Sequence, residues 1–342
     1  MKVALDTSPL TSGHRVRGIG TYTKNLAQAL VKIAGLELVT FQGGKIPDCD
    51  IVHYPYFDLF FQSLPIFKNK PTVVTIHDVV PLRFPQHFPS GIRGQLKFLL
   101  QKLSLQSARA VVTDSDASKS DIVKFLKVAP QKIFSIHLAP SPIFSRISDQ
   151  SQLDAARQKY QLPASYILYV GDVSYNKNLP RLLEAIADLD VNLVMVGQAV
   201  ADETVAETKE LMTKINQLGL KERVWRLGFV ADEDLVAIYN LAGCLVLPSL
   251  AEGFGLPVLE AMATGCPVVT SNISSMAEIA GAAAILVDPN DTKNISWGIR
   301  EVLDRDKGEA LREKGAEQVK KFSWDKTAQA TVKVYRQVLG HE

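Results

Sequence analysis

The sequence lacks the features that mark secreted, disulfide-bonded and membrane-spanning proteins. Its 342 residues contain three cysteines, too few and too scattered for a disulfide framework, and no CxxC pair that would suggest zinc. No apolar run approaches the roughly 18–20 residues needed to cross a bilayer. The N-terminus, MKVALDTSPL, is typical of a short strand rather than a signal peptide. We therefore expect a cytoplasmic protein that is soluble or, at most, bound to the inner face of the cytoplasmic membrane.

Acidic residues are scarce in the first half of the chain. Residues 1–163 carry 20 Lys and Arg against 11 Asp and Glu, and Glu37 is their only glutamate. The remainder carries 18 basic against 25 acidic residues. This difference indicates two domains, of which the basic one suits an anionic surface or acceptor; a random bias of composition is the alternative.

Apolar runs and helical periodicities alternate along the chain in two series. Strands are expected at 2–6, 36–41, 50–53, 72–76, 110–113 and 133–136, and the clearest helices of this series at 20–34, 92–108 and 116–127. A second series starts with the strand at 166–171, after a stretch rich in Pro and Ser. The pattern predicts an α/β protein with two doubly wound, Rossmann-like domains. The expected parts are an N-terminal domain of residues 1–163, a C-terminal domain of residues 164–323 and a final helical segment of residues 324–342.

One stretch of the second series, PSLAEGFGLPVLEAMATGC at 248–266, combines a strand end, a glycine turn and a helix start. The free N–H groups at a helix N-terminus suit an anion. Glu252 and Glu260 frame the turn, and carboxylates accept hydrogen bonds from hydroxyl groups. A phosphate site flanked by such carboxylates indicates a sugar nucleotide. The alternative is a solvated Glu252 and a Glu260 favoured by the helix dipole.

Five segments resemble one family in their order and spacing. They are DTSPL…RGIGTYTKNLAQAL (6–30), VVTIHDVVPLRFP (73–85), VVTDSDASKSDI (111–122), YVGDVSYNKNLPRLLEA (169–185) and SLAEGFGLPVLEAMATGCPVV (249–269). The chain is similar to retaining glycosyltransferases of family 4, in particular to bacterial mannosyltransferase-like members. The resemblance implies the GT-B architecture, in which two Rossmann-like domains face a central cleft and the last helix crosses back to the first domain.

The resemblance assigns the donor site to the second domain. Glu252 would bind hydroxyls of the transferred sugar and Glu260 those of the ribose. The backbone N–H groups of Phe254, Gly255 and Leu256 would meet the diphosphate at the helix N-terminus.

A lysine after the first strand of this domain is the expected cation. Lys177 would neutralise the diphosphate and support its departure, unless it is simply a surface lysine in a polar turn. Many family members have arginine directly after the glycine, where this sequence has Asp172. Arg181, one helical turn on, could substitute, although a plain surface role is favoured for it.

Residues of the first domain would approach the donor from the other side. By resemblance, the Gly18 amide would approach the leaving phosphate and His77 would lie beside the reacting sugar. Arg15 and Arg17 are candidate phosphate or acceptor contacts, with an ordinary surface loop as the alternative. His77 could instead be a packed core residue, and His53 is a lesser candidate.

An aromatic loop at 54–67 and a helix with Arg93, Lys97 and Lys102 lie in the same domain. Together they could dock on anionic lipid. A buried helix with a charged outer stripe explains most of the same residues and is the favoured interpretation.

These features predict a retaining hexosyltransferase whose catalytic residues are Glu252, Lys177 and His77. The expected donor is a GDP-sugar or UDP-sugar, with mannose favoured. The expected acceptor is a glycan or a polyprenyl-diphosphate-linked glycan of surface polysaccharide or glycolipid synthesis. No DxD pair invites a divalent cation, so we expect no metal and no other cofactor. We also expect peripheral membrane contact through the basic domain and no nucleic-acid partner. The alternative is a nucleotide-sugar-binding protein that is catalytically impaired or has another activity, such as epimerisation.

Overall fold

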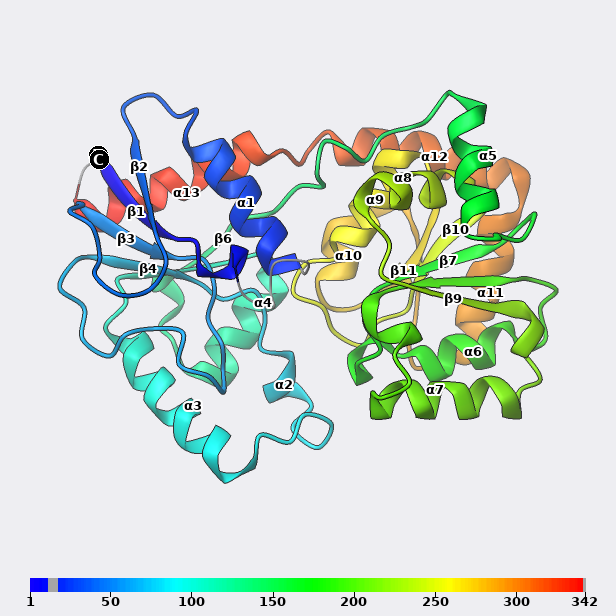
Figure 1. Ribbon diagram of the computed structural model, residues 1–342, viewed down its shortest axis with the longest axis horizontal. Helices are drawn as coiled ribbons and strands as arrows, with labels where there is room; N and C mark the ends of the chain where they lie inside the picture. Colours follow the sequence, from blue (N-terminus) through cyan, green and yellow to red (C-terminus); the bar gives the residue numbers. More distant parts are fainter. Residues whose placement is uncertain (12–17, 341–342) are drawn as a thin grey trace. The chain divides into compact units, whose positions relative to one another are not determined.

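The computed structural model describes residues 1–11 and 18–340, so Arg15 and Arg17 lie outside the described residues. The chain divides into two compact units, each built on a six-stranded parallel sheet with helices packed around it (Figure 1). Unit 1 comprises Met1–Ala139 and Phe322–Glu342, and unit 2 comprises Pro140–Lys321. The predicted boundary at residue 163 is therefore too late, because helix α5 (Gln150–Lys159) packs against α8 (Asp232–Leu241) of unit 2.

Unit 1 has the strand order β2-β1-β3-β4-β5-β6. The direction of winding changes between β1 and β3, so the carboxyl ends of these strands form a topological switch point. The strands are Lys2–Asp6, Glu37–Phe41, Ile51–Tyr54, Thr72–Thr75, Ala110–Thr113 and Ile133–Ser135 (β1 to β6). The helices are α1 Gly18–Leu30, α2 Val80–Arg83, α3 Gly91–Gln106, α4 Asp116–Asp121 and α13 Trp324–Leu339. The helix predicted at 116–127 is thus shorter, because a π-helical turn, Ile122–Leu126, follows α4.

Unit 2 has the strand order β9-β8-β7-β10-β11-β12, and its switch point lies between β7 and β10. Its strands β7, β8 and β10 are buried throughout or nearly so, as expected for a parallel sheet covered by helices. The strands are Ile167–Val170, Leu193–Val196, Val224–Gly228, Cys244–Leu247, Val268–Ser271 and Ile285–Val287 (β7 to β12). Beside α5 and α8, the helices are α6 Leu179–Ala187, α7 Ala206–Gln217, α9 Leu256–Thr264, α10 Ser274–Ala280, α11 Thr292–Leu303 and α12 Arg305–Val319.

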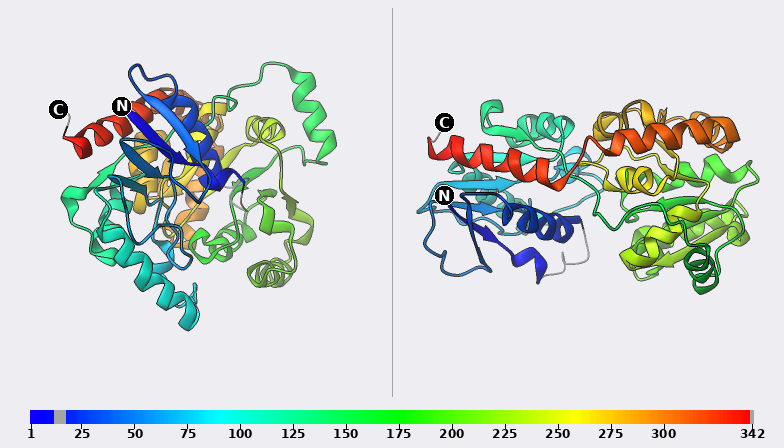
Figure 2. Two further views of the ribbon diagram at one scale, coloured as in Figure 1. Left: turned by 60° about the vertical axis from the view of Figure 1, so that its left-hand side comes forward. Right: turned by 90° about the horizontal axis from the view of Figure 1, so that it is seen from above.

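The last helix, α13, belongs to unit 1 and runs beside α1 (Figure 2). The Tyr335 hydroxyl lies 2.6 Å from Nδ1 of His53, which is in the centre of the sheet. Thr327 Oγ1 donates to the carbonyl of His137 at 2.7 Å. These polar contacts, together with a buried apolar face, fix α13 to the sheet.

Candidate active site

Two loops of unit 2 meet at the switch point between β7 and β10. The loop after β7 contains a 3-10 turn, Tyr175–Lys177, and the loop after β10 contains Glu252 and leads into α9. Both loops follow the carboxyl ends of neighbouring strands, which is where open α/β sheets bind their ligands. The sheet thereby brings together Lys177 and Glu252, which are 75 positions apart in the sequence.

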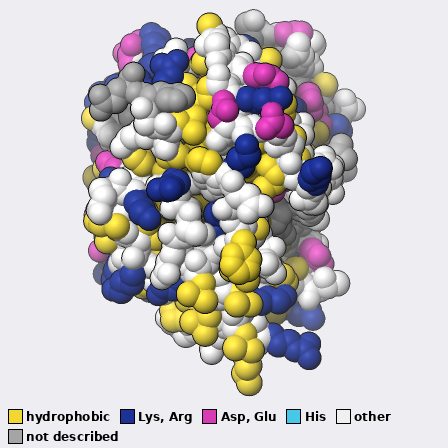
Figure 3. All heavy atoms as spheres, turned by 90° about the vertical axis from the view of Figure 1, so that its left-hand side faces the viewer, with side chains coloured by type: hydrophobic (Ala, Val, Ile, Leu, Met, Phe, Trp, Pro, Cys, Tyr) yellow, Lys and Arg dark blue, Asp and Glu magenta, His cyan; other side chains and the backbone are white. Residues whose placement is uncertain are grey.

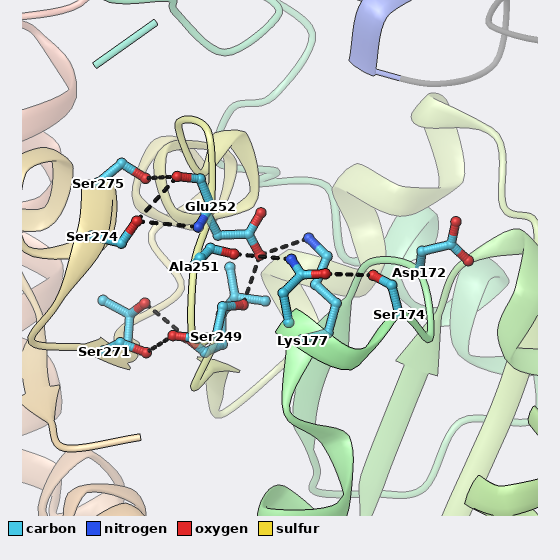
Figure 4. Close-up of polar contacts among 12 residues, drawn as sticks. Asp172, Ser174, Lys177, Ser249, Ala251, Glu252, Ser271, Ser274 and Ser275 are labelled. Carbon is cyan, nitrogen blue, oxygen red and sulfur yellow. Dashed lines mark hydrogen bonds and ion pairs between the residues drawn. The ribbon is translucent and has the colours of Figure 1, made fainter. Parts of the chain in front are cut away.

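Lys177 and Glu252 form an ion pair, with 2.7 Å between Nζ and Oε1 (Figure 4). Ser249 Oγ donates to the same oxygen at 2.7 Å. The two charged side chains are 16% and 12% exposed, so water screens their attraction less than on an open surface. Among the described residues, Oε2 of Glu252 accepts no hydrogen bond and the ammonium has no second acceptor. The pair can therefore still bind hydroxyl groups and anionic oxygens.

The backbone around Glu252 is held by short polar residues of other loops. Ser274 and Ser275 donate to the Glu252 carbonyl at 3.2 and 3.0 Å, and Asn176 Nδ2 donates to the Ala251 carbonyl at 2.9 Å (Figure 4). Ser274 has a φ of +59°, which is uncommon for a residue other than glycine. We did not identify these supporting residues from the sequence, and only the S-x-x-E spacing of Ser249 and Glu252 offered a signal.

The turn between Glu252 and α9 requires glycine at position 255. Its φ is +108°, and a Cβ there would lie 2.2 Å from Cε of Met276. Gly255 is the N-cap of α9, and no side chain caps this helix. In the first turn Pro257 has no N–H and the Val258 N–H donates to the Gly255 carbonyl at 3.0 Å, so the N–H groups of Gly255 and Leu256 are the ones that can face an anion. Phe254 is buried beside them, so the three predicted phosphate-binding residues do lie at a helix N-terminus.

Glu260 lies in the second turn of α9 and accepts a hydrogen bond from the Tyr239 hydroxyl at 2.9 Å. Burial raises the pKa of this carboxyl to about 7, and the charge of Asp232 adds to the effect while the Tyr239 hydroxyl opposes it. Additional hydroxyl donors would lower this pKa, because they stabilise the ionised form. The Glu260 carboxyl is thus suited to a ligand whose hydroxyl groups donate hydrogen bonds to it.

The residue at the family's arginine position, Asp172, is exposed, and its carboxylate points away from Lys177 and Glu252 (Figure 4). Arg181 does not contact that ion pair: its Nη1 donates to Oδ1 of Asn178 at 2.9 Å. Asn178 in turn donates to the carbonyls of Pro248 and Pro289. In this structure Arg181 therefore supports the loop rather than the charged pair.

His77 follows β4 in unit 1, and both of its ring nitrogens are hydrogen-bonded. Nδ1 lies 2.7 Å from Oδ2 of Asp114, and Nε2 lies 3.1 Å from the carbonyl oxygen of Pro55. Burial lowers the pKa of His77, but the charge and hydrogen bond of Asp114, with smaller contributions from Asp78 and Pro55, raise it above its ordinary value. A carbonyl only accepts hydrogen bonds, so Nε2 donates to Pro55, and a positively charged ring would also donate from Nδ1 to Asp114.

His53 was a lesser candidate for the site, and this candidacy is wrong because His53 is a core residue. It is fully buried, its ring nitrogens contact Tyr335 and Thr75, and burial lowers its pKa to about 3. Gly18 is exposed at the start of α1, and a Cβ there would meet no atom within 4 Å. Steric crowding by the described residues therefore does not explain this glycine.

Within residues 1–11 and 18–340, no group of three or more His, Cys, Asp or Glu side chains is placed to hold a metal ion. None of the helices in that part of the chain combines the length and the apolarity needed to cross a membrane.

Comparisons with known proteins identify the family. The family described as "Glycosyl transferases group 1" matches residues 153–322, and "Glycosyltransferase Family 4" matches residues 44–139. The O-antigen chain mannosyltransferase B of Escherichia coli is 34% identical to this chain over 269 residues, covering 77% of this chain and 70% of that protein. The chain belongs to glycosyltransferase family 4. The serotype-specific mannosyltransferase WbdA of Escherichia coli is 29% identical over 290 residues, and they cover 82% of this chain but only 35% of WbdA. This family 4 chain thus spans about a third of WbdA, and its relatives support a hexosyltransferase.

Solved structures confirm the predicted GT-B fold of this glycosyltransferase. Sucrose-phosphate synthase (tll1590) from Thermosynechococcus elongatus has a TM-score of 0.78 at 20% identity, and the match covers 100% of both chains. Anabaena Alr3699/HepE in complex with UDP-glucose has a TM-score of 0.77 at 19% identity, covering 98% of this chain and 100% of that one.

Proposed function

We propose that this chain transfers a hexose, with mannose favoured, from a nucleotide-diphosphate sugar to a glycan or lipid-linked acceptor. The observation that carries the proposal is the Lys177–Glu252 pair beside the uncapped N-terminus of α9, at the switch point of unit 2. An ammonium and backbone N–H groups suit a diphosphate, and a carboxylate oxygen without a partner suits sugar hydroxyls. The mannosyltransferase relatives support the choice of sugar, and the HepE complex with UDP-glucose supports a nucleotide-sugar donor.

Lys177 and Glu252 would bind different parts of the donor. Lys177 would turn from Glu252 to the diphosphate and stabilise the charge that develops as the bond to the sugar breaks. Glu252 would keep its hydrogen bond from Ser249 and accept sugar hydroxyls with Oε2. Glu260 would accept the ribose hydroxyls, and Arg181 would add a second cation if it left Asn178.

Retention would occur without a carboxylate nucleophile. In this scheme the bond between the anomeric carbon and the diphosphate oxygen breaks, and the departing oxygen takes the proton of the acceptor hydroxyl. The acceptor oxygen then bonds the anomeric carbon on the same face. Lys177 and the backbone N–H groups would stabilise the negative charge of the diphosphate, so no divalent cation would take part. His77, charged and held by Asp114, would contribute positive charge rather than accept a proton.

The acceptor would use a cavity of about 460 Å³ in unit 1, at the carboxyl ends of β1, β2 and β3. Its wall includes Asp6, Phe41, Tyr54 and Tyr56. The rings of Phe41 and Tyr54 pack edge to face with centroids 5.9 Å apart. A carboxylate beside aromatic rings suits a sugar, which presents both hydroxyl groups and apolar C–H faces.

Release of nucleotide diphosphate from a panel of UDP-, GDP- and ADP-hexoses tests the proposal. We expect one donor to be turned over at the same rate with and without EDTA, and a product that keeps the donor's anomeric configuration by NMR. Lys177→Met and Glu252→Gln should each lower turnover by roughly 100- to 1000-fold. The Lys214–Glu184 pair, 2.5 Å apart in the same unit, offers matched controls: Lys214→Met and Glu184→Gln should leave turnover unchanged.

Each part of the proposal would be contradicted by a different experimental result. Turnover of no donor, or full activity of both site variants, would overturn it. Loss of activity with EDTA would contradict metal independence alone, and an inverted product would contradict retention alone. Conversion of the donor into an epimeric nucleotide sugar would favour the epimerase alternative.

A further inference from the structure

A row of apolar side chains lies exposed along α3 of unit 1. Its members are at least 46% exposed, and they are Ile92, Leu96, Leu99, Leu100 and Leu103. At about 3.6 residues per turn these positions fall within an arc of roughly 100°. The opposite side of α3 is buried and includes Gln101 and Leu105. The favoured sequence-based interpretation, a buried helix with a charged outer stripe, is therefore wrong, because the leucines lie on the outer side.

The loop before β4 extends this exposed row. Gln101 Nε2 donates to the Asp58 carbonyl at 2.8 Å, and Lys68 donates to the Ser104 carbonyl, so hydrogen bonds tie the loop to α3. The exposed apolar residues of the loop are Phe61, Ile66 and Phe67, the last of them 88% exposed. These three and the five residues of α3 are called the α3 surface below. The remaining exposed large apolar residues of the described chain lie elsewhere, and no single element of unit 2 in that part of the chain carries more than two of them, Trp297 and Leu303 on α11.

The charged residues of α3 that border the α3 surface are basic, while the loop contributes one carboxylate, Asp58, which accepts from the Phe61 N–H at 2.8 Å. Helix α3 contains no Asp or Glu. At helical spacing, Arg93 and Lys97 flank one side of the apolar row and Lys102 flanks the other. Lys97 Nζ lies 4.9 Å from the centre of the Phe61 ring. Figure 3 shows apolar side chains gathered at the lower end of this face with Lys and Arg on both sides.

This charge pattern decides between the partners that an apolar surface can have. In a two-fold symmetric dimer the same patch meets itself, so the basic residues Arg93, Lys97 and Lys102 would lie against the basic flanks of the second copy and repel them. An anionic bilayer instead offers negative charge over a whole plane and an apolar interior beneath it. An amphipathic helix with basic flanks is typical of a surface that lies in the membrane interface.

We infer that the α3 surface docks the protein on an anionic lipid membrane, with α3 in the plane of the interface. The inference goes beyond the proposed sugar transfer and does not depend on it. The loop that extends the α3 surface also supplies residues 62–65 to the wall of the cavity in unit 1. Docking would therefore hold that cavity near the lipid headgroups, where a lipid-linked acceptor would be found.

Flotation of the full chain with vesicles tests the docking without any sugar donor. We expect binding to vesicles of phosphatidylcholine with phosphatidylglycerol, weak binding to phosphatidylcholine alone, and loss of binding at high salt. The triple variant Arg93→Gln, Lys97→Gln, Lys102→Gln should bind anionic vesicles about 100-fold more weakly. The triple variant Leu96→Gln, Leu99→Gln, Leu103→Gln should also lose binding, with an unchanged circular dichroism spectrum.

A matched control uses apolar residues that are equally exposed elsewhere. Val31 and Phe229 are 68% and 60% exposed, and Val31→Gln with Phe229→Gln should bind as the unaltered chain does. Equal binding to both vesicle types, or unchanged binding of both triple variants, would overturn the inference.

A site-specific label distinguishes docking through α3 from docking through another face. Cys49, Cys244 and Cys266 are all buried, so one introduced cysteine can be labelled selectively. An environment-sensitive dye on Leu99→Cys should report an apolar environment with anionic vesicles, whereas the same dye on Leu303→Cys, in unit 2, should not. If the leucine variants instead dissociate an oligomer in light scattering while the chain ignores vesicles, a second copy covers the α3 surface and the inference fails.

Discussion

The two units share an architecture, but the candidate site residues at the carboxyl ends of their strands, the histidines of unit 1 and Glu252 of unit 2, differ in how fully their side chains are hydrogen-bonded. In unit 1, His53 and His77 each have both ring nitrogens hydrogen-bonded within the unit, although Oδ1 of Asp114 is buried without a partner among the described residues. In unit 2, Glu252 keeps one oxygen without a donor among the described residues, and no side chain caps α9. Groups that the fold satisfies stabilise the fold, whereas groups that it leaves half satisfied remain available to a ligand.

The largest difference should appear when the charged pair of unit 2 is removed. The double variant Lys177→Met, Glu252→Gln should lose turnover by at least 100-fold, because the diphosphate would lose its cation. Its free energy of unfolding should change by about 1 kcal/mol or less, because no unpaired charge is left behind. Donor turnover and urea unfolding measured on the same preparation check both halves. A large loss of stability would mean that the pair is structural and that the contrast between the units is wrong.

In unit 1 the corresponding change should affect stability. Asp114→Asn leaves the His77 ring without its counter-charge in a mostly buried position, which should cost about 3 kcal/mol at pH 6. The folded pKa of His77 is raised, so the stability from this pair is fully present below the unfolded pKa of about 6.5 and is lost as pH rises through the folded pKa. The cost of Asp114→Asn should therefore shrink at pH 9.

Urea unfolding at the two pH values tests this prediction, and nitrogen NMR adds a direct view of the ring. Protons on both Nδ1 and Nε2 of His77 at pH 7 are the expected result. A cost that is independent of pH, or a neutral ring at pH 7, would show that the His77–Asp114 contact is not an ion pair.

The glycine turn of unit 2 should tolerate no side chain. Gly255→Ala places a Cβ in a positive-φ conformation and against Met276, and about 2 kcal/mol of stability should be lost. Adding Met276→Ala removes the clash with Cε but leaves the backbone strain. Thermal unfolding should therefore show partial recovery in the double variant relative to Met276→Ala alone. Donor binding, measured by calorimetry, should stay weak in both Gly255 variants, because the N–H groups at the start of α9 would be displaced.

Much of this arrangement could be predicted from the sequence, because parallel strands are buried on both faces and leave unbroken apolar runs. The apolar runs that precede Lys177 and Glu252 in the sequence predicted that both residues follow the ends of strands. The supporting contacts of Ser249 and Ser274 could not be predicted, since short polar side chains carry no signal of distant partners. Helical periodicity identified the apolar row of α3 but did not show whether the row faces the core or the outside, because apolar residues have the same spacing in both cases. The Pro-rich stretch indicated a connection between two domains, but it did not show that α5 belongs to unit 2 and packs against α8.

Substitution of Glu260 should have the opposite effect on stability, because removing its charge stabilises the ligand-free fold, and a ligand should reverse that sign. The folded pKa of about 7 lies above the ordinary value of 4.5, so the ligand-free protein loses stability as pH rises from about 4.5 through 7. Glu260→Gln should therefore be about 1–3 kcal/mol more stable than the unaltered chain at pH 8 and nearly equal at pH 4.5. Urea unfolding across this range measures the difference, with Glu184→Gln as the control for removing a partly exposed, ion-paired carboxylate of the same unit.

Donor binding should favour the ionised form of Glu260, because ribose hydroxyls donate to a carboxylate. Below pH 7 the protonated carboxyl must lose its proton before it can accept from both hydroxyls, so binding should release a proton and weaken as the pH falls. Calorimetry in two buffers of different ionisation enthalpy counts that proton. Glu260→Gln should bind the donor weakly at every pH and release none. Wild-type affinity in Glu260→Gln would show that this carboxyl, like the histidines of unit 1, is satisfied by its own fold through Tyr239.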